Sequence, residues 1–183
     1  MKKNIGKQIG LYPTPLAVVG ATVNGETNWV LVGHLGIMGH DRIMISLAKA
    51  HYTNQGIKEN GVLSVNLVDE KLLPKADYVG SVSGADTDKS QVFDLAIGLS
   101  GAPMIADSPL VMECKVAESY ETDGFDNFVL SIENTYVEEQ YLTEQGKIDY
   151  SKLKPVLFEM PTYEYLKTGE IIGKCRSFGK DLK

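Results

Sequence analysis

The segment spanning residues 28–53 constrains the fold most, because it joins two strand-like runs through a glycine-containing loop. The first run, residues 29–32, is apolar, and the second covers residues 43–47. The polar string Lys49-Ala50-His51-Tyr52-Thr53 follows directly. Cationic and hydroxyl side chains are therefore expected beside free backbone N–H groups at one end of a sheet. Such an arrangement suits a small, flat ligand that carries a phosphate.

Local signals predict how the chain enters and leaves this segment. Residues 16–22 lead into Asn24-Gly25, a pair that supplies the two positive φ angles of a tight hairpin turn. The first two strands are therefore expected to pair antiparallel. Thr53 is predicted to N-cap a short helix that ends at Gly61.

Later segments add strands and one more helix. A fourth strand is predicted over residues 62–67, and residues 71–79 have the apolar spacing of a helix. Residues 80–90 form a loop rich in Gly, Ser and Asp, either functional or simply exposed. Residues 111–120 and 128–132 alternate in hydrophobicity, as half-buried antiparallel strands do. Strands at short spacing with only minor helices predict a mainly β domain that forms a closed or nearly closed barrel.

Length, charge and composition limit the possible functions. A chain of 183 residues fits one domain, residues 1–183. A formal charge of -6 argues against nucleic-acid binding, and the apolar runs are too short for a membrane span. Two cysteines far apart indicate neither a disulfide framework nor a metal site, and we expect a cytoplasmic protein. The tail with Ile171, Ile172 and Phe178 is expected to pack on its own barrel or on a second subunit.

Motifs along nearly the whole chain resemble the FMN-binding split-barrel family of flavin reductase-like proteins, especially its flavoredoxin-like branch. The residues that carry the resemblance are Tyr12-Pro13-Thr14-Pro15, Asn28, Lys49-Ala50-His51-Tyr52-Thr53, Gly61, Ser64-Val65-Asn66, Asp77-Tyr78, Gly80, Ser83-Gly84, Asp88-Lys89-Ser90, Ala102-Pro103-Met104-Ile105, Pro109-Leu110, Glu113-Cys114, Lys154-Pro155, Phe158, Tyr165, Gly169 and Gly173-Lys174. Each motif is short, and their common order makes the resemblance specific.

The resemblance implies a Greek-key split β-barrel with a few short helices that binds one FMN per subunit near a homodimer interface, with NADH or NADPH as transient co-substrate. The implied FMN contacts are His34, Leu35, Gly36 and Ile37 beside the isoalloxazine ring, Ser46, Leu47, Ala48 and Lys49 along the ring and ribityl chain, and Lys49, His51, Tyr52, Thr53, Ser83 and Lys89 near the phosphate. Ala50 stands where many members of the family carry Ser, so one phosphate donor is absent.

Each of these residues also has an ordinary structural explanation. Lys49 fits a solvated lysine at a strand end as well as a phosphate ligand, and Lys89 stands in a charged loop. In the functional interpretation, His34 contacts the edge of the flavin ring or a nicotinamide. In the structural one, backbone groups satisfy the hydrogen bonds of its imidazole. His51 fits a surface histidine as well as a phosphate donor, whereas Thr53 can serve as both cap and ligand.

The sequence assigns no catalytic residue, because the cofactor itself carries out hydride transfer. It shows no Ser-His-Asp triad and no G-x-G-x-x-G motif, so a nicotinamide would bind only transiently over the flavin. Three hypotheses follow. The first is an oxidoreductase that passes electrons from NAD(P)H to flavin or onward to an acceptor, with a small-molecule nucleotide or a redox protein as partner. The second is an FMN-binding electron carrier or storage protein without NAD(P)H activity, and the third is a split barrel that has lost its cofactor.

Overall fold

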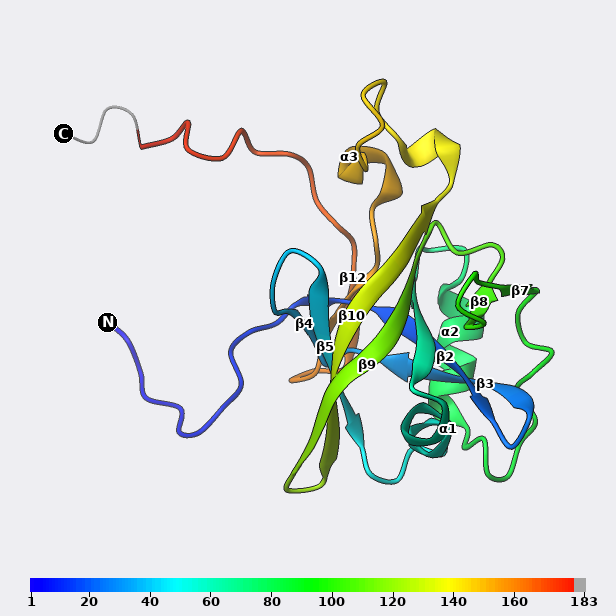
Figure 1. Cartoon of the computed structure of the whole chain (residues 1–183). Coiled ribbons are helices and arrows are strands. Elements are labelled where there is room, and N and C mark those ends of the chain that lie inside the picture. The colour runs from blue at the N-terminus through cyan, green and yellow to red at the C-terminus, as the bar shows by residue number, and fades with distance from the viewer. Residues whose placement is uncertain (180–183) are drawn as a thin grey trace.

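The structure, a computed structural model, describes residues 1–179 of the chain. Its body is a curled seven-stranded antiparallel sheet with the strand order β3-β2-β6-β9-β10-β5-β4 (Figure 1). These strands are β2 (Ala17–Val23), β3 (Glu26–Val32), β4 (Leu35–Ile37), β5 (Arg42–Ala48), β6 (Val62–Leu67), β9 (Leu110–Thr122) and β10 (Phe125–Val137). The two edge strands, β3 and β4, are separated in the chain only by Gly33 and His34, so the sheet curls to bring its edges together at that corner.

Two small sheets and a few short helices complete the fold. The strands β1 (Thr14–Pro15), β11 (Leu157–Glu159) and β12 (Glu164–Leu166) form one sheet, and β7 (Leu95–Ile97) pairs with β8 (Pro103–Ile105). The helices are α1 (Thr53–Asn60), α2 (Leu73–Ser81) and α3 (Tyr150–Leu153), with one 3-10 turn, η1 (Glu139–Tyr141). This arrangement confirms the predicted mainly β fold with minor helices.

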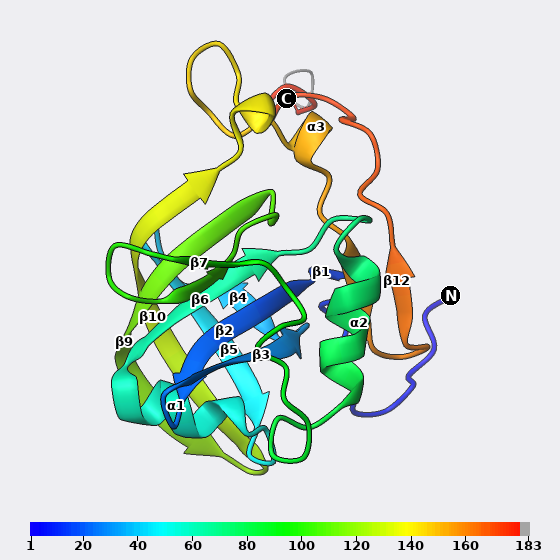
Figure 2. The same cartoon turned by 90° about the vertical axis from the view of Figure 1, so that its right-hand side faces the viewer.

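The hydrophobic core has two parts. The inner face of the curled sheet packs into one cluster, which α1 covers at one end with Ile57. On the outer face of β2 and β3, Trp29 packs with Ala76 and Val79 of α2 in the second cluster. Helix α2 therefore lies against that face, with β12 beside it (Figure 2), and Tyr165 of β12 donates a hydrogen bond of 2.6 Å to Asp77 of α2.

Most of the local predictions are confirmed. Asn24 and Gly25 have φ angles of 51° and 86° in the turn between β2 and β3, and Gly61 ends α1 with a φ of 66°. Strand β6 covers the predicted residues 62–67, and β9 and β10 contain the two alternating segments.

Four details of the sequence-based predictions are wrong or incomplete. Tyr52, not Thr53, occupies the N-cap position of α1, and the Thr53 hydroxyl instead accepts a hydrogen bond of 2.7 Å from Asn28. The glycine-containing loop after β3 holds a short strand, β4, and the second helix begins and ends two residues later than predicted. Glu113, placed on the same face as the exposed Lys115 by alternation, is fully buried because four donors surround its carboxylate.

The C-terminal segment does not pack on its own barrel. Ile171, Ile172 and Phe178 are all at least 70% exposed, and both terminal segments run outside the sheet body (Figure 1). Of the two expectations for this tail, packing on a second subunit therefore remains. Among residues 1–179, no helix is long and apolar enough to cross a membrane.

Candidate functional site

A first cleft of about 260 Å³ opens where the end of β3 meets the end of β5. The lining is mostly apolar, with two histidines and one serine among it: Leu16, Leu31, Val32, Gly33, His34, Ser46, Leu47, Ala48, His51, Phe125, Phe158 and Met160. A Cβ atom at Gly33 would lie 2.6 Å from the ring of Phe158, so the absence of a side chain lets this ring pack across the strand end. The Ser46 N–H donates to the His34 carbonyl at 2.9 Å, which fixes the two walls relative to each other.

A second cleft of about 240 Å³ continues from the first, because His51 lines both. It lies between the start of α1 and the loop that follows α2, and its lining is Val30, Ala50, His51, Tyr52, Thr53, Val79, Gly80, Ser81, Val82, Ser83, Gly84 and Lys89. A side chain on Gly84 would overlap the Asn28 amide oxygen, so glycine lets this loop pack closely on β3. The positive dipole end of α1 makes this cleft suitable for an anion, although the N–H groups of Asn54 and Gln55 in its first turn already donate to the carbonyls of His51 and Tyr52.

Lys89 is the buried cation of the second cleft. It is only 3% exposed, and its ammonium group donates to the carbonyl oxygens of Trp29, at 2.9 Å, and Val79, at 2.8 Å. An ammonium group has three N–H donors, so one remains after these two bonds. None of the ion pairs within residues 1–179 includes Lys89, and burial lowers its pKa. The cleft therefore holds a positive charge without a carboxylate to neutralise it.

His51 is held neutral by its surroundings. Burial lowers the pKa of His51, and the positive charge of Lys89 lowers it further. At neutral pH the imidazole therefore offers one N–H donor and one acceptor rather than a second cation. The electrostatic attraction for an anion comes mainly from Lys89 and the start of α1.

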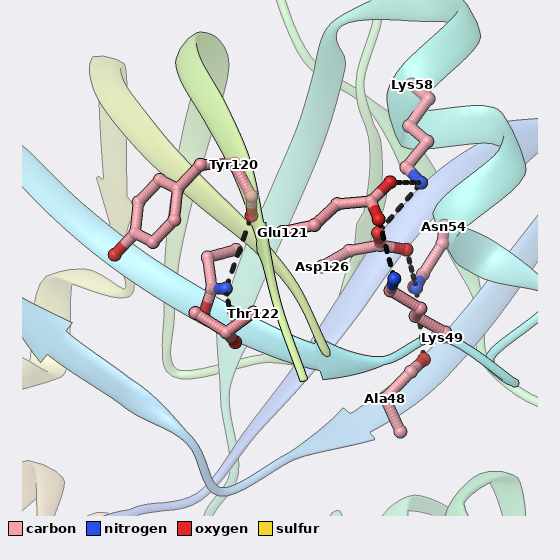
Figure 3. A network of polar contacts seen from close by, with 9 residues as sticks. Ala48, Lys49, Asn54, Lys58, Tyr120, Glu121, Thr122 and Asp126 are labelled. Carbon is pink, nitrogen blue, oxygen red and sulfur yellow. Dashed lines mark hydrogen bonds and ion pairs between the residues drawn. The ribbon is translucent and has the colours of Figure 1, made fainter. Parts of the chain in front are cut away.

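Lys49 has a different environment (Figure 3). Its side chain is 47% exposed and its ammonium group forms an ion pair of 2.5 Å with Glu121. In the same network, Asp126 accepts hydrogen bonds from Lys58, at 2.8 Å, and from the Asn54 amide, at 2.7 Å. The Asn54 amide also donates to the Ala48 carbonyl at 3.0 Å. This network ties the start of α1 to β5 and β10, and so fixes the edge of the second cleft.

The comparisons with known proteins agree with this arrangement of strands. The sequence pattern of the flavin reductase like domain matches residues 9–164, which is most of the chain. The chain belongs to the flavin reductase-like family. This confirms the resemblance drawn from its motifs.

Solved structures of flavin reductase-like proteins share the whole fold. The flavoredoxin of Methanosarcina acetivorans is 37% identical, with a TM-score of 0.94 and complete coverage of both chains. The flavoredoxin of Desulfovibrio vulgaris (Miyazaki F) is 32% identical, with a TM-score of 0.90 over 98% of this chain and 100% of that one. An FMN-binding protein from Thermus thermophilus is 20% identical and has a TM-score of 0.82 over 96% and 100% of the two chains, a likeness of fold. The predicted split barrel is thereby confirmed.

A curated relative of this flavin reductase-like chain is longer. An uncharacterized protein of Aeropyrum pernix is 26% identical over 144 residues, which are 72% of this chain and 52% of that protein. The chain thus spans about half the length of the curated relative that it matches.

The fold brings most of the predicted site residues of this flavin reductase-like protein together. His34, Ser46, Leu47, Ala48 and His51 line the first cleft, and His51, Tyr52, Thr53, Ser83 and Lys89 line the second. Leu35 and Gly36 instead line a neighbouring apolar cleft, and neither Ile37 nor Lys49 lines any of these three. Whether each residue contacts FMN stays a prediction.

Two lining residues of the first cleft had no signal in the sequence. Phe125 begins β10 directly after a turn, and Met160 follows β11. Both come from segments far along the chain, where an isolated aromatic or thioether side chain indicates packing as readily as ligand contact.

Proposed function

We propose that this flavin reductase-like protein binds FMN, with the isoalloxazine ring in the first cleft and the phosphate in the second. The observation that carries the proposal is Lys89, a buried ammonium group that forms no ion pair within the described residues. A buried charge without a partner is costly, and a phosphate beside it would supply the missing negative charge.

The donors of the second cleft fit a phosphate group. The third N–H of Lys89, the His51 imidazole and the Ser83 hydroxyl can each donate to a phosphate oxygen, and the positive dipole end of α1 would attract its negative charge. Ala50 lines the same cleft without a hydroxyl, so these groups would hold the phosphate without a donor at that position.

The first cleft fits the ring system. The side chains of Leu47, Phe125 and Phe158 offer an apolar surface for a flat heterocycle, and His34 and Ser46 add polar groups at its edge. Bound FMN would supply hydride and electron transfer, whereas the protein binds the ring, orients it and excludes water from one face. An apolar wall supports both the orientation and the exclusion of water.

We infer that the bound flavin is reduced by NADH or NADPH and passes its electrons to an acceptor, which makes the protein an oxidoreductase. The second candidate is an FMN-binding electron carrier without NAD(P)H activity of its own. It is kept because both compared proteins above 30% identity are named flavoredoxins.

We also propose that the protein is a homodimer. Large apolar side chains on the C-terminal segment, Ile171, Ile172 and Phe178, are exposed on the single chain. A second copy that covered them would remove this surface from water.

The absorbance spectrum of the purified protein, recorded before and after anaerobic addition of NADH and then NADPH, tests this function. Flavin bands near ~370 and ~450 nm, which come from the ring system itself, are expected for a tight FMN complex. Bleaching by either nucleotide supports the reductase, and bands that persist favour the carrier. A colourless protein that also fails to bind added FMN would contradict both.

A further inference from the structure

A third cleft, of about 440 Å³, lies between the N-terminal segment and strands β4 and β5. Its lining is predominantly apolar and consists of Ile9, Leu11, Tyr12, Thr14, Gly33, His34, Leu35, Gly36, Met44, Ser46 and Phe125. Four of these residues, Gly33, His34, Ser46 and Phe125, also line the first cleft. A molecule in the third cleft would therefore lie directly beside a ring bound in the first.

One pair of polar side chains in this cleft can act on a ligand. The Tyr12 hydroxyl lies 2.7 Å from Nε2 of His34, in the wall that the two clefts share, and its only other partner among residues 1–179 is the sulfur of Met160, a weak acceptor at 3.7 Å that a ligand carbonyl can replace. The other two hydroxyls are already committed, since Thr14 donates to the Gly33 carbonyl and Ser46 to Asn127, each at 2.7 Å. Burial raises the pKa of Tyr12, with a smaller contribution from Tyr163, so its hydroxyl keeps its proton at neutral pH.

We propose that the third cleft binds a flat, apolar quinone as the electron acceptor, and that Tyr12 donates a hydrogen bond and then a proton to its carbonyl oxygen. The proposal rests on the proposed flavin function, because it needs a reduced flavin in the first cleft as the reductant.

The reaction balances with these groups. Reduced FMN, when bound, would supply a hydride, which is two electrons and one proton, and the Tyr12 hydroxyl would supply the second proton that turns the quinone into a hydroquinone. Tyr12 would then recover its proton from water that enters the open cleft, with His34 holding the hydroxyl in place.

The lining of the cleft selects this class of acceptor. An apolar wall formed by Ile9, Leu11, Leu35 and Met44 disfavours a charged molecule such as a nicotinamide nucleotide, whose phosphates would lose their hydration there. A quinone needs only a flat apolar surface and a donor for its oxygen. The second copy of a dimer is the competing occupant of such a surface, and the experiments below separate the two.

The first experiment measures binding without turnover. The probe is 2-acetylnaphthalene, a flat ketone, titrated calorimetrically into the FMN-loaded wild type and variants. One site per chain is expected, with affinity about fivefold weaker in Tyr12→Phe, as for loss of one neutral hydrogen bond. Gly36→Leu should abolish binding, because a Cβ atom at Gly36 meets nothing within 4 Å and the added side chain would fill the cleft. Tyr150→Phe is the matched control, since Tyr150 is 53% exposed and lines none of the three clefts.

The second experiment measures the oxidative half-reaction. Protein reduced with dithionite is mixed anaerobically with 2-methyl-1,4-naphthoquinone, and the return of the oxidised flavin spectrum is followed. Tyr12→Phe should slow this step about 100-fold, the lower range for loss of a general acid, and Tyr150→Phe should leave it unchanged. The wild-type rate should fall at alkaline pH as the Tyr12 hydroxyl loses its proton, and the rate of Tyr12→Phe should not show this fall.

Three results would overturn the proposal. The first is a quinone reaction as fast in Tyr12→Phe as in the wild type. The second is probe affinity that does not change in either cleft variant. The third is a combination of two observations: the wild type binds no probe at a specific site, and Gly36→Leu no longer forms a dimer. Together they would assign the cleft to a second copy of the chain. A protein that binds no FMN refutes the proposed function instead, and probe binding to the flavin-free chain would still be measurable.

Discussion

Replacing Lys89 by Met separates the phosphate from the ring as sources of flavin affinity. The substitution keeps a long, unbranched side chain and removes the ammonium group that donates to Trp29 and Val79. We expect FMN to bind more weakly and riboflavin, which has no phosphate, to bind as before. The difference between the two ligands therefore isolates the charge on Lys89.

The structure sets the size of the effect. Two unit charges at about 4 Å attract each other by about 4 kcal/mol at an effective dielectric constant near 20. The phosphate loses hydration on entering the cleft, so the net loss of FMN binding energy should be about 2–3 kcal/mol. At about 1.4 kcal/mol per factor of ten, the dissociation constant of FMN should rise by roughly 30–150-fold. That of riboflavin should stay within about twofold.

The assay is quenching of flavin fluorescence during titration of flavin-free protein, with circular dichroism to check that the variant is folded. Lys49→Ala is the comparison, because the sequence predicts a phosphate contact there. The Lys49 ammonium group lies at the surface, where water screens its charge, and Glu121 already neutralises it. We therefore expect the FMN affinity of Lys49→Ala to fall by less than about fivefold, and an unchanged value would remove Lys49 from the phosphate site. An equal loss of FMN and riboflavin affinity in Lys89→Met would refute the phosphate role of Lys89 and make it a structural residue.

Three further predictions test the fold and the assembly. Gly56→Ala should lower the free energy of unfolding, measured in urea, by about 1–3 kcal/mol, because the added Cβ atom would overlap the Thr22 carbonyl. The expected sign is the reverse of the usual one, since Ala normally stabilises a helix interior by about 1 kcal/mol relative to Gly. A more stable variant would contradict this close packing. Burial alone would raise the pKa of Glu113, but its hydrogen bonds outweigh burial and hold the pKa below its usual value. Glu113→Gln should therefore cost about 2–3 kcal/mol at pH 7, and the difference from wild type should shrink below about pH 4, as the wild-type carboxylate is protonated. A pH-independent difference in urea denaturation would refute it. Ile172→Asp should weaken self-association in analytical ultracentrifugation without changing the stability of the single chain, and an unaltered dimer would exclude this part of the tail from the interface.

The sequence predicts those parts of the fold that short-range interactions determine. The Asn24-Gly25 turn and the Gly61 helix end require positive φ angles, and only a few residue types adopt them readily. Strand β6 is a short, mostly apolar run that begins directly after Gly61 and ends just before Val68 and the polar pair Asp69-Glu70, so its limits are largely local as well. Each of these features is specified within a few residues of where it occurs.

Features that depend on distant partners are not predictable in this way. From local sequence alone the Thr53 hydroxyl would cap α1, but in the structure it accepts a hydrogen bond from the Asn28 amide on β3. Alternation places Glu113 with exposed residues, whereas Asn134, Tyr136 and two backbone N–H groups near residue 100 surround it with donors. In both cases the competing partner is known only after the sheet has formed.

The two lysines of the candidate site show the same limit where it affects function. Lys49 stands among hydroxyl and imidazole side chains, so local sequence favours it as the phosphate ligand, yet Glu121, 72 residues later, pairs with its ammonium group. Lys89 follows Asp86 and Asp88 in a loop whose composition suggests exposure to solvent. The loop nevertheless folds over β3 and α2, and the carbonyls of Trp29 and Val79 accept hydrogen bonds from its buried ammonium group. A cluster of polar residues in the sequence therefore indicates the region of an anion site. Which cation binds the anion depends on which one is buried without a carboxylate, a property that only the tertiary structure determines.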